Sequence, residues 1–172
     1  MEFYIIKYFF VLVAAKVIGA AVHIESMQLC EKQDYAIMWG MNLKDEGNQQ
    51  VVEDGFMETK IDVDNDVMNK IIIYKKEGEN WNQLVTKTDG TCIMAKNFMG
   101  EFINGLENAA GMKQTCPYTK GKYQIKNYPL DFSTFKYKDF PPGTIKIRSE
   151  FYGKNDSEKL LSCYEAIFTM TA

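Results

Sequence analysis

The sequence predicts an all-β protein, and three observations lead to this fold class. Short runs of apolar and β-branched residues alternate with clusters of turn-forming residues through most of the chain. Near the C-terminus, Ile145 and Ile147 alternate with Lys146 and Arg148, as in a strand with one buried face. Only one segment has the spacing of a helix. We therefore expect about eight strands with one short helix inserted between them.

The first residues have the features of an export signal. Lys7 precedes the apolar run 8–15, and small residues follow at 19–21, where a signal peptidase could cut. The apolar run is shorter than the roughly 20 residues of a bilayer-spanning helix, and Lys16 interrupts it. An uncleaved amphipathic anchor is the alternative. We expect residues 1–20 to be a signal peptide and residues 21–172 to form one domain, secreted to the extracellular space rather than held in the lysosome.

The expected strands are separated by residues that favour turns. Turn-forming residues cluster at 45–48, 64–66, 77–78 and 89–90. The only histidine, His23, precedes the first expected strand and is expected to belong to a disordered terminus. The expected strands are Glu25–Glu31, Tyr35–Lys44, Gln50–Val63, Val67–Lys76, Trp81–Lys87, Lys122–Tyr128, Thr144–Tyr152 and Lys159–Met170.

The segment Asn97–Ala110 differs from the rest of the chain. Its apolar residues recur at helical spacing, Asn97 is a candidate N-cap, and Gly105 is the one unfavourable residue within it. The sequence leaves open whether this apolar face packs into the core or lines a ligand site. The residues on it are Phe98, Met99, Phe102, Ile103, Leu106 and Ala109.

Aromatic residues gather in the segment 129–142, which is bounded by Pro129 and by Pro141–Pro142. Prolines disfavour regular strand pairing, so we expect a loop. An edge strand with inward-facing rings is the alternative. Methionine suits sites that accept flexible alkyl chains, although ordinary core packing is its more common role. The methionines on or near expected elements are Met27, Met38, Met41, Met57, Met68, Met94, Met99 and Met112.

The four cysteines of the expected mature chain indicate two disulfides in an oxidising compartment, with three pairings possible. The sequence contains no Cys-x-x-Cys motif and a single histidine, so we expect no zinc or other metal site. Asn155 begins the one acceptor sequon, Asn-Asp-Ser, and is a candidate glycosylation site.

Few residues could support catalysis, and we expect neither an enzyme nor a cofactor. The common hydrolase, metalloprotease and phosphate-loop motifs are absent. The run Asp62–Asp66 resembles the start of a calcium loop, but Val67 and Ile73 replace its glycine and glutamate, which favours a hairpin turn. The formal net charge of −3 gives no reason to expect nucleic-acid binding.

Three segments of the C-terminal half resemble the ganglioside activator family of ML-type lipid-recognition proteins, and its secreted, CheB-like chemosensory relatives in insects. They are Cys116–Ile125, Pro141–Ile147 and the final strand with Cys163. The resemblance implies a two-sheet antiparallel β-cup that binds lipid. It also implies the pairings Cys30–Cys163 and Cys92–Cys116, and transient membrane contact by the aromatic loop. This chain lacks four of the eight cysteines of the mammalian activator and departs from its glycine motifs.

The resulting expectation is a secreted, non-catalytic carrier of a lipid or another hydrophobic molecule, with a chemosensory or lipid-transfer role. The protein partner to be considered is a receptor, a channel or a hydrolase. The alternative is a secreted interaction protein with a filled core that binds a receptor or channel through its surface. The residues expected to contact the ligand are Trp39, Phe98, Met99, Phe102, Ile103, Leu106, Phe132, Phe135, Tyr137 and Phe140.

Overall fold

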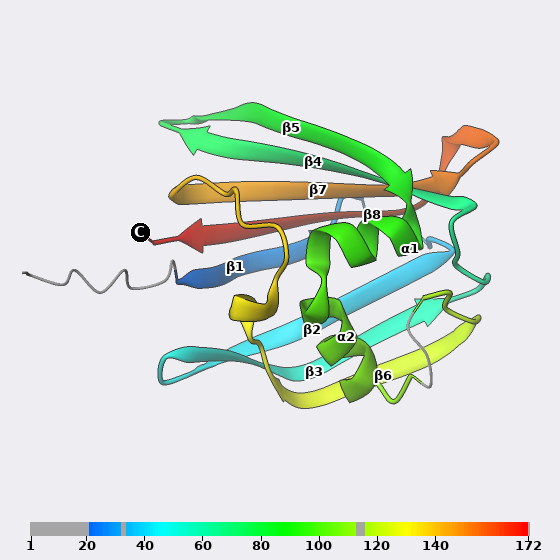
Figure 1. Ribbon diagram of the computed structural model, residues 1–172, viewed down its shortest axis with the longest axis horizontal. Coiled ribbons are helices and arrows are strands. Elements are labelled where there is room, and N and C mark those ends of the chain that lie inside the picture. Colours follow the sequence, from blue (N-terminus) through cyan, green and yellow to red (C-terminus); the bar gives the residue numbers. More distant parts are fainter. Residues whose placement is uncertain (1–20, 32–33, 113–115, 172) are drawn as a thin grey trace, which may run out of the picture.

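The computed structural model describes residues 21–31, 34–112 and 116–171, which form an all-β domain of eight strands with a helical insertion (Figure 1). The expected signal peptide lies outside the described residues. All eight expected strands are present, with ends that differ by a few residues. They are β1 (Val22–Leu29), β2 (Ile37–Glu46), β3 (Gln49–Thr59), β4 (Val67–Glu77), β5 (Asn80–Gly90), β6 (Gly121–Pro129), β7 (Gly143–Gly153) and β8 (Asp156–Met170).

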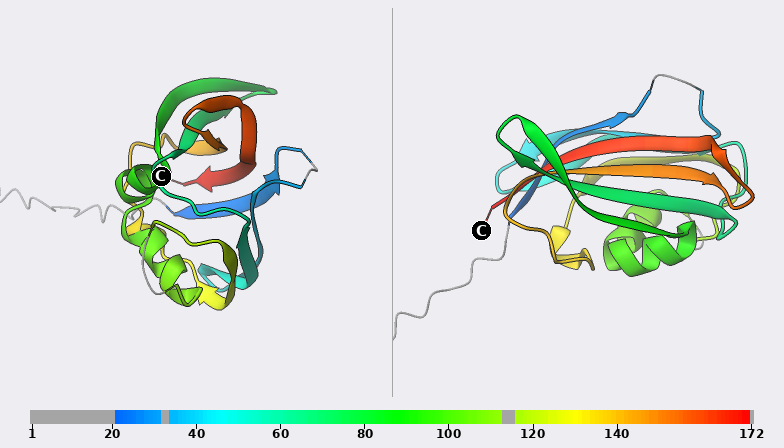
Figure 2. Two further views of the ribbon diagram at one scale, coloured as in Figure 1. Left: turned by 90° about the vertical axis from the view of Figure 1, so that its right-hand side faces the viewer. Right: turned by 90° about the horizontal axis from the view of Figure 1, so that it is seen from above.

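The strands form two antiparallel sheets. One sheet has the order β1-β8-β7-β4-β5 and the other has the order β2-β3-β6. Figure 2 shows the two sheets curving around a shared interior, with the helices on the side where the sheets diverge. The two-sheet architecture expected above is therefore present.

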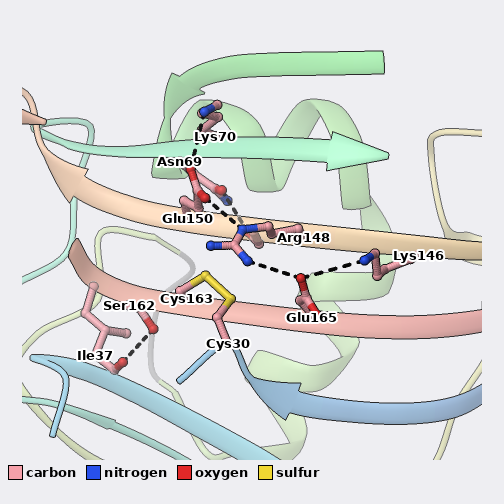
Figure 3. Close-up of a disulfide and its surroundings, with 11 residues drawn as sticks. Cys30, Ile37, Asn69, Lys70, Lys146, Arg148, Glu150, Ser162, Cys163 and Glu165 are labelled. Atoms are coloured by element: carbon pink, nitrogen blue, oxygen red, sulfur yellow. Dashed lines mark hydrogen bonds and ion pairs between the residues drawn. A yellow bond between two sulfur atoms is a disulfide. The ribbon is translucent and has the colours of Figure 1, made fainter. Parts of the chain in front are cut away.

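The strand β7 shows why the larger sheet has a buried face and a polar face. Ile145 is fully buried, and Ile147 and Ser149 point to the interior. The charged residues between them lie on the outer face, where Arg148 donates to Glu150 at 2.8 Å and to Glu165 of β8 at 3.1 Å (Figure 3). Two lysines extend this charged row: Lys70 of β4 lies 3.4 Å from Glu150, and Lys146 lies 4.0 Å from Glu165.

The two sheets are joined by side chains that bond to backbone groups of the opposite sheet. Gln50 of β3 accepts from the Ile24 N–H at 2.7 Å and donates to the Ile24 carbonyl at 3.1 Å. Ser162 of β8 donates to the Ile37 carbonyl at 2.6 Å (Figure 3). The Tyr164 hydroxyl accepts from the Trp39 N–H. These bonds close the seam between β1–β8 and β2–β3, where a continuous ladder is missing.

The helical insertion begins six residues before the expected N-cap. It comprises α1 (Thr91–Met94), the π-helical turn η1 (Ala95–Met99) and α2 (Glu101–Ala109). Asn97 lies inside η1, so its expected capping role is wrong. A residue distant in sequence caps the N-terminus of α1 instead: Asn65 Oδ1 accepts a hydrogen bond from the Ile93 N–H at 3.1 Å. Gly100, with φ of +64°, turns the chain between η1 and α2.

Both disulfide pairings implied by the resemblance are present. Cys30–Cys163 joins the end of β1 to β8 (Figure 3), and Cys92–Cys116 joins the start of α1 to the segment after α2. No cysteine among the described residues is free. The Cys92–Cys116 disulfide therefore ties the start of the insertion to the segment that follows its end.

Two further observations concern the N-terminal strand and the helices. His23 is part of β1, where it pairs with Thr169, so its expected place in a disordered terminus is wrong. None of the helices in the described ranges has the length and apolar content needed to cross a bilayer.

Candidate functional site

A cavity of about 260 Å³ lies between the two sheets, beneath the helical insertion. The insertion bridges the sheets above it, because α1 contacts β4 and β5 while α2 contacts β6 (Figure 1). Both sheets, the insertion and the loop after β6 contribute to the lining. The cavity is therefore built from segments far apart in the sequence.

The lining is apolar on most sides. In the smaller sheet, Trp39, Met41, Met57 and Ile125 face the cavity and are only half-buried. Exposed apolar surface costs about 25 cal/mol per Å² relative to burial. A ligand that covered these side chains would recover that free energy.

Eight of the ten residues expected to contact a ligand line the cavity. They are Trp39, Phe98, Met99, Phe102, Ile103, Leu106, Phe132 and Phe135. Tyr137 and Phe140 do not line it; they pack behind Phe98. Ala109 is exposed, and its neighbour Ala110 faces the cavity instead.

The segment 130–142 is a loop, as expected, and its aromatic rings turn inward. Phe135 meets Phe98 and Phe102 edge-on at ring separations of 5.5 and 5.4 Å. Phe132, in the short 3₁₀ helix η2 (Phe132–Thr134), stacks on Phe102 at 5.1 Å. The rings are half-buried rather than presented to solvent. This region, called here the aromatic end, closes the cavity at the turn between η1 and α2.

Backbone bonds fasten the loop to that turn. Lys136 N–H donates to the Met99 carbonyl at 3.1 Å, and Tyr137 N–H donates to the Phe98 carbonyl at 3.0 Å. A side chain at position 100 would collide with Lys136, whose Cβ would lie 2.7 Å from a Cβ placed there. Glycine is required at this position by both the positive φ and the close approach.

The two lysines of the loop are exposed and bond to nearby carbonyl groups. Lys138 Nζ donates to the Ser133 carbonyl at 2.8 Å, and Lys136 Nζ lies 3.4 Å from the Lys96 carbonyl. Both ammonium groups remain available to solvent, and the exposed Asp131 and Asp139 of the same loop balance their charge, so the loop has a charged outer surface over an aromatic interior.

The opposite end of the cavity is polar, and Glu107 of α2 is its central group. This side chain is only 3% exposed and accepts from the Tyr118 hydroxyl at 2.6 Å. Burial raises the pKa of the Glu107 carboxyl above its ordinary value, and the bonds from Tyr118 and the Cys116 backbone oppose that change. Burial also raises the pKa of Tyr118, with Glu107 adding to the effect.

Three more polar side chains line the same end. Ser149 Oγ lies 2.8 Å from Asn69 Oδ1, and Thr91 Oγ1 donates to the Val67 carbonyl at 2.6 Å. Thr91 precedes Cys92, and Tyr118 follows Cys116 by two residues, so the Cys92–Cys116 disulfide links the segments that carry Thr91 and Tyr118. We call these five residues the polar end of the cavity: Asn69, Thr91, Glu107, Tyr118 and Ser149.

Sequence reasoning missed the polar end, although one signal was available. Glu107 follows Ile103 by four residues and Met99 by eight, which places it on the apolar face of the expected helix. A carboxylate in that position is unusual and marks a buried polar site. Strand alternation predicts that Ser149 shares a face with Ile145 and Ile147, but it does not mark Ser149 or Asn69 as part of a polar site.

Six of the eight methionines noted above line the cavity, as do aromatic residues of β8. The methionines are Met27, Met41, Met57, Met94, Met99 and Met112. Tyr164 and Phe168 alternate with outward-facing residues along β8 and also face inward. The tilted rings of Tyr164 and Trp39 pack together with their centroids 4.2 Å apart, so Trp39 belongs to the wall of the cavity and is anchored there.

Two further sequence predictions concern metal binding and glycosylation. Within the described part of the chain, no group of three or more histidine, cysteine, aspartate or glutamate side chains is arranged to hold a metal ion. Asn155, the candidate glycosylation site, lies at the exposed turn between β7 and β8. No family model matches the chain, and no curated protein matches it.

Proposed function

We propose that this protein is a secreted, non-catalytic carrier that binds a lipid or another hydrophobic small molecule in the cavity between its sheets. The observation that carries the proposal is the apolar cavity of about 260 Å³, whose walls are largely methionine and aromatic side chains, several of them only half-buried. Its volume is close to the lower limit of typical small-molecule sites. Each CH₂ group buried there would contribute about 0.8 kcal/mol to binding.

Two kinds of observation support secretion and a role in lipid transfer. Disulfides persist in oxidising compartments, and this domain has two that connect distant elements. The expected signal peptide and an accessible sequon at Asn155 agree with export. The resemblance to the ganglioside activator family supports a lipid-like ligand and transient membrane contact by the loop.

Native mass spectrometry of protein secreted by eukaryotic cells tests the carrier function. We expect a non-covalent adduct that is lost on denaturation and extracts into organic solvent. A ligand-free protein that also fails to take up the fluorescent apolar probe N-phenylnaphthylamine would contradict it. That result would favour the interaction protein with a filled core.

A variant that fills the cavity separates internal binding from surface adsorption. Ala166 of β8 lines the cavity and is 8% exposed, so Ala166→Phe would occupy space that a ligand needs. Thr86→Phe adds the same ring at an exposed position of β5. We expect Ala166→Phe to lose uptake of the probe and Thr86→Phe to retain it. Equal uptake by the two variants would place the probe on the surface.

A further inference from the structure

The two ends of the cavity differ in polarity, and this difference would orient an amphiphilic ligand. The aromatic end is formed by Phe98, Phe102, Phe132 and Phe135, and these residues offer a ligand no polar side chain. The polar end offers a carboxyl, a carboxamide and three hydroxyl groups. Because a buried polar group needs a hydrogen-bonding partner, the polar part of an amphiphile would lie at the polar end, beside the Cys92–Cys116 disulfide.

The acidic group at that end has no counter-ion among the described residues of the cavity lining. Glu107 is the one Asp, Glu, Lys, Arg or His among the described residues that line the cavity. None of the ion pairs formed by the described residues includes it. Its side-chain hydrogen bond comes from the neutral hydroxyl of Tyr118. A ligand carboxylate placed there would meet like charge in a poorly solvated site and find no cation.

Resting on the proposed carrier function, we propose that the cavity selects an uncharged amphiphile bearing a hydroxyl or ester group, and that Glu107 excludes free fatty acids. Glu107 acts as a specificity-determining residue through its charge. The Asn69–Ser149 pair supplies the hydrogen-bonding surface on the facing sheet, since both residues line the same end. The alkyl part extends toward the aromatic end.

Competition with N-phenylnaphthylamine tests this selectivity with three ligands of one chain length: decanol, methyl decanoate and decanoate. For the wild-type protein at neutral pH, we expect both uncharged ligands to displace the probe at concentrations at least about tenfold lower than decanoate. In Glu107→Gln, which keeps the size and hydrogen-bonding capacity of the side chain, decanoate should approach the two uncharged ligands to within about threefold.

A matched control is present on the same helix. Glu101 is exposed and accepts from Asn104 at 3.0 Å, outside the cavity lining. Glu101→Gln removes the same charge from the chain and should keep the wild-type selectivity. Uptake of the probe by each variant verifies that the cavity is intact.

The outcomes distinguish the inference from the function on which it rests. If the wild-type protein binds neither the probe nor any of the three ligands, the carrier function is wrong. If the protein binds the probe but decanoate competes as well as decanol, the assigned selectivity is wrong while the carrier function stands. The same conclusion follows if Glu101→Gln changes the selectivity as much as Glu107→Gln does.

Discussion

The side-chain amide of Gln50 bonds to both backbone polar groups of Ile24, at 2.7 and 3.1 Å, as a residue of a neighbouring strand would. Gln50 is only 7% exposed, so water cannot replace these bonds. The Gln50 side chain thereby makes the hydrogen bonds that a paired strand would make, at a point where β3 and β1 are not paired.

Replacement of Gln50 by leucine should destabilise the domain, because it leaves the Ile24 amide and carbonyl without partners. Each buried group left unsatisfied costs about 1–3 kcal/mol, so we expect a loss of about 2–4 kcal/mol in the free energy of unfolding. Urea denaturation would measure it. Gln124→Leu, at an exposed position of β6, is the matched control and should change stability by less than about 0.5 kcal/mol. Similar losses in both variants would contradict the role of Gln50.

The strand pattern was predictable from the sequence, but the connections between sheets were not. Alternation and turn residues located all eight strands, because each depends on neighbouring residues along the chain. The bonds of Gln50 and the capping of Ile93 by Asn65 depend on residues more than twenty positions apart. Helical spacing located the apolar face at Phe98, Phe102 and Leu106, whereas Glu107 was missed because a polar residue does not contribute to an apolar pattern.

The aromatic rings of the loop are expected to contribute to stability as well as to ligand contact. Phe135 packs against two rings of the insertion and is half-buried. Phe135→Ala should therefore cost about 2–3 kcal/mol, below the 3–5 typical of a fully buried phenylalanine. Phe56→Ala, at a site where the ring is 44% exposed, should cost less than about 1 kcal/mol. Thermal denaturation would compare them, and an unchanged melting temperature for Phe135→Ala would show that the loop does not pack as described.

Gly105 is explained by a contact with β6 and not by helix conformation. A Cβ at this position would lie 2.2 Å from the Tyr128 hydroxyl oxygen. Gly105→Ala should destabilise the protein by about 1 kcal/mol despite the better helix propensity of alanine, because the ring must move. In the Tyr128→Phe background the same substitution should be neutral or stabilising. A double-mutant cycle measures this coupling, and additive effects would contradict the steric explanation.

The Cys92–Cys116 disulfide should stabilise the insertion and the cavity beneath it. It closes a loop with a sequence separation of 24, for which chain entropy predicts about 3.5 kcal/mol. The double variant Cys92→Ser, Cys116→Ser avoids an unpaired thiol. We expect it to lose about 2–4 kcal/mol in stability and to show faster amide exchange in α1 and α2 than in β7 and β8. Uniform acceleration across all elements would indicate that the disulfide acts on the whole domain instead.

The buried Glu107 carboxyl should make the stability of the protein depend on pH, and the sign of this dependence can be stated. Burial raises its folded-state pKa above the unfolded-state value, so its ionisation opposes folding. This cost is present above the folded-state pKa and disappears as the pH falls below the unfolded-state value. The stability of the wild-type protein relative to Glu107→Gln should therefore increase on acidification through that window. Urea denaturation across mildly acidic pH would measure the difference, and a decrease on acidification would contradict the assignment.

The charged row on the outer face of the larger sheet also constrains how its strands can align. Lys70 lies opposite Glu150, and Arg148 lies opposite Glu165. A slip of two residues keeps every side chain on its own face, so hydrophobic burial alone does not prevent it. Such a slip of β4 along β7 would place Lys70 opposite Arg148 in one direction, and a slip of β7 along β8 would place Glu150 opposite Glu165. Because like charges directly opposite one another repel, the row penalises misaligned sheets during folding and favours the one alignment in which the cavity forms.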